Sequence, residues 1–94
     1  MSMFFKSEKQ IYKVDYRGQM NLFDGAKENY EEGTEVELSY SLIATDTDYT
    51  FYVDGQEVRA EWNDRKGYII RFTMPAHDIE VYCTEKNSME KRIF

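Results

Sequence analysis

From residue 35 onward, apolar side chains occupy every second position, and this alternation constrains the fold more than any other feature of the sequence. Successive side chains of a strand point to opposite faces of a sheet, so alternation is typical of a strand with one buried face. The pattern predicts a weaker first strand at 12–17 and five clear strands at 35–42, 49–53, 58–62, 68–74 and 79–84. The predicted inward positions include Phe51, Ile70, Val81 and, by the same alternation, Trp62.

Short polar stretches between these strands predict antiparallel neighbours. Asp54-Gly55 fits a type I′ hairpin turn, because both central residues of that turn need a positive φ. The strands within 49–84 are therefore expected to form a four-stranded meander with one buried face. With the earlier strands they predict an all-β fold, either a small antiparallel β-sandwich or an open barrel of about six strands.

The length of 94 residues corresponds to a single domain, residues 1–94. We expect an ordered core at about 10–84 and a loose tail at 85–94, which is polar until its last two residues. Residues 18–34 lack a clean apolar period. Their path stays open between a short helical turn and a long connection.

Acidic residues outnumber basic ones, 18 to 12, and the net charge is −6. Nucleic acids and anionic membrane surfaces both attract basic proteins, so neither is an expected partner, and no apolar run approaches the ~20 residues of a membrane span. A basic protein partner is permitted, although moderate acidity also serves solubility. The single Cys83 forms no intramolecular disulfide, and the first ten residues lack the apolar core of a signal peptide, so a cytoplasmic location is expected.

The stretch RFTMPAHDIEVYC at 71–83 contains the chain's only proline, histidine and cysteine, which raises the question of a reactive or metal site. Zinc needs three or four converging ligands, and a nucleophilic thiol needs a base within hydrogen-bond reach. Only His77 and Cys83 qualify here, and six residues separate them. We interpret "PAHD" at 75–78 as a turn with His77 at an exposed tip, and Cys83 as a small buried side chain.

The same stretch carries a family resemblance. "YEEGTEVEL" at 30–38 and "GYIIRFTMPAHDIEVYC" at 67–83 resemble the bacterial internalin-B-type repeat, which has a tyrosine before "G-T-x-V-x-L" and then "F-T-M-P-x-x-D-x-x-V". The resemblance implies a small β-rich module of the kind found in adhesion or spacing arrays on cell-surface proteins. "LIATDTDYTFYVDG" at 42–55, together with a hairpin at "MPAHDIEV" (74–81), more closely resembles small stand-alone bacterial proteins of about this length, for which the resemblance implies a fold and no assigned activity.

Asp46, Asp48 and Asp54 alternate like half of a calcium site, or they stabilise turns through side-chain bonds to the backbone, and the sequence leaves both readings open. It contains no phosphate-binding glycine loop, nucleophile elbow or metal-ligand spacing. The chain is therefore predicted not to be an enzyme and to use no cofactor.

Two surfaces are candidates for protein contact. If the inward positions are buried, Tyr52, Ile69 and Tyr82 point outward on adjacent strands, and Ile43 joins them by the same alternation. This contact patch is either exposed or covered by the N-terminal segment or the tail. The second surface is an acidic docking edge made of Glu28, Glu31, Glu32, Glu35 and Glu37.

These features predict a non-catalytic protein–protein interaction module, which contacts an unknown protein partner or forms a homodimer through the contact patch. One alternative is an acidic inhibitor or immunity-type protein that docks a basic partner through the acidic edge. Another, implied by the resemblance, is an adhesion-type module detached from its usual array.

Overall fold

The computed structural model describes residues 9–87, which form nine strands and one short 3₁₀ helix. The elements are β1 (Ile11–Asp15), η2 (Met20–Leu22), β2 (Phe23–Asp24), β3 (Asn29–Glu31), β4 (Glu35–Tyr40), β5 (Thr47–Val53), β6 (Gln56–Val58), β7 (Glu61–Asn63), β8 (Gly67–Thr73) and β9 (Ile79–Asn87). The described residues contain no helix with the length and apolar character needed to cross a bilayer.

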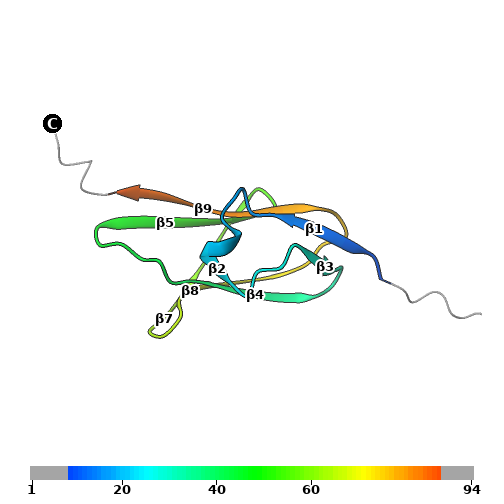
Figure 1. The fold of residues 1–94 in the computed structure, drawn as a ribbon, viewed down its shortest axis with the longest axis horizontal. Coiled ribbons are helices and arrows are strands. Elements are labelled where there is room, and N and C mark those ends of the chain that lie inside the picture. Colours follow the sequence, from blue (N-terminus) through cyan, green and yellow to red (C-terminus); the bar gives the residue numbers. More distant parts are fainter. Residues whose placement is uncertain (1–8, 88–94) are drawn as a thin grey trace, which may run out of the picture.

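The strands form two facing sheets. One has the order β3-β1-β9-β5-β6 and the other has the order β2-β4-β8-β7. Figure 1 shows β1, β5 and β9 in one layer and β4 and β8 in the layer that faces it. All strand pairs are antiparallel except β1 and β9, which are parallel. The predicted small antiparallel β-sandwich is confirmed, except that β1 and β9 pair in parallel.

The core lies between the two sheets and follows the predicted alternation. Phe51 and Val81 from the five-stranded sheet are buried together with Leu38 and Ile70 from the four-stranded sheet. Full burial of such a side chain stabilises the fold by about 1.5–3 kcal/mol. The predicted inward positions of β5, β8 and β9 are therefore correct.

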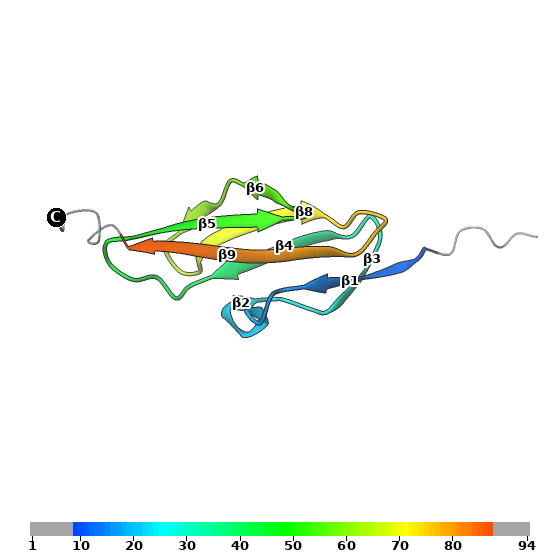
Figure 2. The same cartoon turned by 90° about the horizontal axis from the view of Figure 1, so that it is seen from above.

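The meander predicted at 49–84 is only partly correct. The β5–β6 and β7–β8 hairpins form, and Asp54 and Gly55 have the positive φ expected of the first turn. The chain, however, crosses between sheets from β6 to β7 and again from β8 to β9, so the four strands are divided between two layers. Figure 2 shows the resulting order, with β1, β9 and β5 side by side and β6 at the edge.

Backbone hydrogen bonds after β8 explain the second crossing. Met74 is buried, its N–H donates to the carbonyl of Thr34, and its carbonyl accepts the N–H of Gly33. Pro75 has no N–H and cannot continue the ladder. The chain therefore leaves the four-stranded sheet here, and β9 begins beside β1 in the other layer.

The path of residues 18–34 combines both alternatives, because η2 is a helical turn and the rest is a connection that adds the short strands β2 and β3. Two buried tyrosines hold this connection. The Tyr16 hydroxyl donates to the carbonyl of Lys27 at 2.7 Å, and the Tyr30 hydroxyl accepts the N–H of Lys27 at 3.0 Å. Burial and the neighbouring Tyr30 raise the pKa of Tyr16, so its hydroxyl stays protonated as a donor.

The ordered core extends past its predicted end at residue 84. β9 continues to Asn87 because every residue of β5 has a pairing partner on β9, from the pair Val53–Val81 to the pair Thr47–Asn87. The rest of the predicted loose tail, residues 88–94, lies outside the described residues.

The predicted burial of Trp62 is wrong, since its side chain is 57% exposed. Trp62 lies on β7, the edge strand of the four-stranded sheet, and its ring packs edge-on against Tyr68 at a centroid distance of 5.2 Å. Its indole N–H donates to Asp64 at 3.0 Å. Alternation identifies the face of a strand, but burial also requires a facing layer, and an edge strand meets less of it.

Candidate interaction face

The predicted contact patch is not one surface. Tyr52 on β5 and Tyr82 on β9 are direct cross-strand partners on the outer face of the five-stranded sheet. Ile69 lies on β8 in the other sheet and is 5% exposed, and Ile43 lies in the connection after β4 and is 38% exposed. The expectation of adjacent strands assumed that β8 and β9 pair, whereas they belong to different layers.

The predicted acidic docking edge is also divided. Glu28, Glu31 and Glu32 lie at or beside β3, the edge strand of the five-stranded sheet. Glu35 and Glu37 lie on the outward side of β4, which is an interior strand of the four-stranded sheet. The Glu35 carboxylate accepts a hydrogen bond from the Thr73 hydroxyl, and the Glu37 carboxylate forms salt bridges with Arg71 and Lys66.

Tyr52 and Tyr82, the two residues of the predicted contact patch that do share a surface, form a stack. The two rings lie 5.0 Å apart between centroids with an interplanar angle of 19°. Both side chains are half-buried. They point outward because their neighbours along each strand, Phe51 and Val81, occupy the core. An offset stack of this kind is worth about 0.5–1.5 kcal/mol beyond area burial.

Arg17 extends the stack on the β1 side. Its guanidinium carbon lies 3.8 Å from the centroid of the Tyr82 ring, and Nη2 bonds to Glu80 Oε1 at 2.8 Å. The turn after β1 positions it, since Arg17 has a φ of 54° and its N–H donates to the Asp15 carboxylate at 2.9 Å. The hydrogen bond to Glu80 raises the pKa of Arg17 further.

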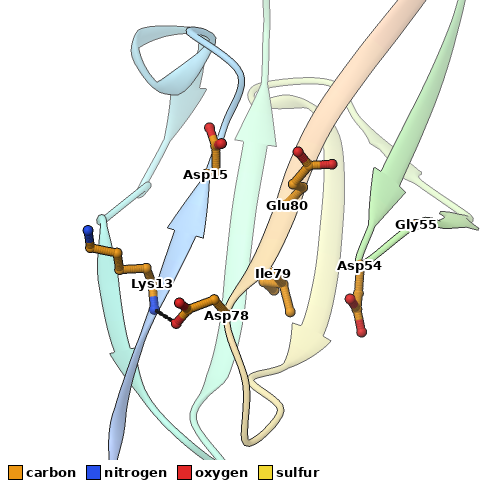
Figure 3. Close-up of a pocket in the computed structure, with 7 residues that line it drawn as sticks. All are labelled: Lys13, Asp15, Asp54, Gly55, Asp78, Ile79 and Glu80. Atoms are coloured by element: carbon orange, nitrogen blue, oxygen red, sulfur yellow. Dashed lines mark hydrogen bonds between the residues drawn. The ribbon is translucent and has the colours of Figure 1, made fainter.

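An acidic hollow of about 570 Å³ lies beside Arg17 and the tyrosine stack, since Glu80, the partner of Arg17, is one of its lining residues. It is lined by Lys13, Asp15, Asp54, Gly55, Asp78, Ile79 and Glu80. Figure 3 shows these residues where β1 runs beside the start of β9, together with the turn that follows β5. The lining residues carry four carboxylates and one ammonium group, so the hollow favours cations.

Each of these carboxylates already has one local partner. Asp78 accepts the backbone N–H of Lys13 at 2.8 Å, and Asp54 Oδ2 lies 2.8 Å from His77 Nε2. The predicted exposure of His77 at a loop tip is correct. Its pairing with Asp54 had no signal in the sequence, because 23 residues separate them and only the fold brings the two loops to one end.

Cys83 is buried on the inner face of β9, as predicted. Burial, and then the charge of Glu85, raise the pKa of this thiol to about 11. The thiol is therefore protonated at neutral pH, whereas a nucleophilic cysteine must be a thiolate. His77 pairs with Asp54 in the loop region instead of serving as a base for Cys83.

The sequence left open a calcium half-site at Asp46, Asp48 and Asp54, but these three residues do not converge. Asp46 and Asp48 lie at the start of β5, and Asp54 follows its end. A seven-residue strand is about 20 Å long, which is far beyond the reach of one ion. Among residues 9–87, no three His, Cys, Asp or Glu side chains are grouped to hold a metal ion.

Comparisons with known proteins give no further guide to this face. A scan against models of protein families, a search of curated proteins and a search of solved structures each returned no match.

Proposed function

We propose that this chain is a non-catalytic protein-interaction module whose contact face is the outer face of the five-stranded sheet around Tyr52 and Tyr82. The observation that carries the proposal is the half-exposed tyrosine stack with Arg17 against it. Tyrosine and arginine are the side chains that protein interfaces favour, because they bury large areas and still hydrogen-bond at their tips. An outer sheet face built only for solvent needs neither ring.

Charge favours a basic protein as the partner. The acidic hollow beside the stack holds four carboxylates and one ammonium group, and the whole chain has a net charge of −6. A twofold homodimer through this face would bring two such hollows together, because an isologous interface pairs each patch with itself. Like charges in that position oppose association, whereas a basic partner is attracted and steered.

The proposal thus joins the interaction module with the inhibitor-type alternative, but it moves the contact from the divided acidic edge to the tyrosine face. The adhesion-type alternative rests on the sequence resemblance alone, and the comparisons neither support nor oppose it. A cytoplasmic location remains part of the proposal, because the chain has one cysteine and that cysteine is buried.

The test begins with capture of partners from a lysate of the source cells by the immobilised wild-type chain, Tyr82→Ser and Trp62→Ser. Trp62 is a matched control, since it is an exposed aromatic side chain on the other sheet. Each captured protein is then purified, and its binding is measured by calorimetry with the same three chains. Circular dichroism verifies that both variants fold.

We expect the partner to bind Tyr82→Ser at least tenfold more weakly than wild type and to bind Trp62→Ser as tightly as wild type. A tenfold loss corresponds to about 1.4 kcal/mol of binding free energy from the Tyr82 contact. A partner that binds Tyr82→Ser as well as wild type contradicts the proposed face. Light scattering covers the remaining case. If the wild type is a dimer and Tyr82→Ser is a monomer, the proposed contact face is supported, but the partner is a second copy of the chain and not a basic protein.

A further inference from the structure

The outer face of the five-stranded sheet carries a row of four side chains, one from each successive element. Arg17 follows β1, Tyr82 lies on β9, Tyr52 on β5 and Glu57 on β6. Tyr52 is the direct cross-strand partner of both Tyr82 and Glu57. Directly opposed residues point to the same face of a sheet with their Cβ atoms about 4.5–5.5 Å apart, so the row is continuous.

One end of this row is a complete arginine-binding site that the chain fills itself. The Arg17 guanidinium lies 3.8 Å from the Tyr82 ring centroid and pairs with Glu80 at 2.8 Å. A planar guanidinium can stack on a ring and bond a carboxylate at the same time, and both contacts are present here.

The other end has the same components and lacks the cation. One side of Tyr52 meets Tyr82, and β6 with Glu57 lies on the other side. Glu57 is exposed, and its carboxylate has no hydrogen-bond or ion-pair partner among residues 9–87. Arg59 follows it by two residues and forms no ion pair with it.

We propose that Tyr52 and Glu57 form a receptor site for an arginine side chain of the basic partner, an inference that rests on the proposed function. The incoming guanidinium stacks on Tyr52 and bonds Glu57, the same two kinds of group that hold Arg17. The carboxylate is placed differently, because Glu57 lies directly across from Tyr52 on β6 whereas Glu80 precedes Tyr82 by two residues on β9. Arginine suits this site better than lysine, because an ammonium group is a strongly hydrated point charge that cannot stack as a plane.

Repulsion from Arg17 does not block this site. Arg17 is paired with Glu80 at 2.8 Å and stacks on Tyr82, whose ring centroid lies 5.0 Å from that of Tyr52. The paired charge, and screening over about 8 Å at physiological salt, weaken its repulsion of an incoming cation. The site also adjoins the acidic hollow through the β5–β6 turn, where Asp54 and Gly55 line that hollow. A second basic residue of the partner segment can therefore be attracted at the same time.

The test is a titration followed by nitrogen-15 NMR, with acetyl-Gly-Arg-Gly-amide as the probe. The same peptide with lysine and with citrulline, a neutral isostere of arginine, provides the controls. We expect resonances of Tyr52 and Glu57 to shift with the arginine peptide, to shift at severalfold higher concentrations of the lysine peptide, and not to respond to citrulline. Glu57→Gln should weaken the arginine peptide about fivefold, the size of one exposed charge pair.

Glu31→Gln is the matched control, because Glu31 is an exposed carboxylate on the opposite edge strand of the same sheet. Arg59→Gln should leave binding as strong as in wild type or strengthen it. The inference is overturned if arginine and citrulline peptides shift the same resonances equally, if Glu57→Gln and Glu31→Gln behave alike, or if the shifts centre on Asp15 and Asp78.

Failure of the site and failure of the function remain distinguishable. A captured partner that is lost with Tyr82→Ser but binds Glu57→Gln as tightly as wild type would keep the tyrosine face and remove the arginine site. A partner unaffected by both variants would remove the proposed function together with the site.

Discussion

Gln19 and Cys83 are joined by two hydrogen bonds in opposite directions. The Gln19 carboxamide donates through Nε2 to the carbonyl oxygen of Cys83 at 3.0 Å, and its Oε1 accepts the Cys83 N–H at 2.8 Å. β1 pairs with β9 only at Val14–Ile79 and Asp15–Glu80 before the chain turns away. A side chain thus replaces the missing strand and satisfies backbone groups that would otherwise lose their partners.

Gln19→Ala should lower the free energy of unfolding by about 1–3 kcal/mol, because it leaves one donor and one acceptor of Cys83 unsatisfied in a partly buried position. Urea unfolding measures the change. Gln10→Ala is the control, since Gln10 is exposed ahead of β1 and should lose less than about 0.5 kcal/mol. Equal losses in the two variants would show that the two hydrogen bonds from the Gln19 side chain to the Cys83 backbone do not stabilise the fold.

Arg17→Ala should open a second arginine site, because it vacates the Tyr82 ring and the Glu80 carboxylate together. The arginine peptide is then expected to shift resonances of Tyr82 and Glu80 in addition to those of Tyr52 and Glu57. Arg71→Ala is the control, since Arg71 pairs with Glu37 and Glu61 on the other sheet. A titration of Arg17→Ala that matches wild type would show that the ring and carboxylate alone do not bind arginine.

Gly67→Ala should destabilise the fold more than Gly18→Ala, although both glycines have a φ near +85°. A left-handed conformation costs an alanine about 1–2 kcal/mol at either position. At Gly67 the added Cβ would also collide with the backbone oxygen of Tyr40, whereas at Gly18 nothing lies within 4 Å. Thermal unfolding should show that Gly67→Ala loses about 1–3 kcal/mol more stability than Gly18→Ala, the usual cost of overpacking. Similar losses in the two variants would contradict the close approach of β8 to Tyr40.

Trp62→Ala should lower stability by only about 0.5–1.5 kcal/mol, the value of its aromatic contact with Tyr68. Phe51→Ala should lower it by about 3–5 kcal/mol, because Phe51 is a core residue. Trp62 is the single tryptophan, so its fluorescence gives an independent measurement. We expect acrylamide to quench the native emission nearly as well as the emission in urea, and a strongly protected native emission would contradict the exposure of Trp62.

Stability should fall as the pH rises from 9 to 11. Burial raises the pKa of Cys83 from 9.0 to about 11, so in this range the folded protein keeps a proton that the unfolded chain releases. The contribution of the neutral thiol is fully present below pH 9 and is lost as the pH rises through about 11. Tyr40, whose pKa burial raises to about 12, extends the loss to higher pH.

Urea midpoints measured from pH 8 to 11 check this prediction. Cys83→Ala should show a shallower decline over the interval, because the variant has no thiol to ionise. Identical slopes in wild type and Cys83→Ala would assign the alkaline loss to other groups.

Much of the fold could be predicted because a strand's alternation is local. Phe51, Ile70 and Val81 are buried where the period of two places them, and Asp54-Gly55 makes the turn that its positive φ values permit. The outward direction of Tyr52 and Tyr82 follows from the same geometry. The sequence by itself therefore determined the all-β class and the direction of most side chains in the strands.

The tertiary structure alone decided which strands share a sheet. Two strands of one layer and two strands of facing layers show the same alternation, so the pattern could not separate Ile69 from Tyr52 and Tyr82 or divide the acidic edge. The pairs Arg17–Tyr82, His77–Asp54 and Gln19–Cys83 join residues far apart in the chain. Such contacts depend on how the two layers close over a common core, which is a property of the whole packed chain.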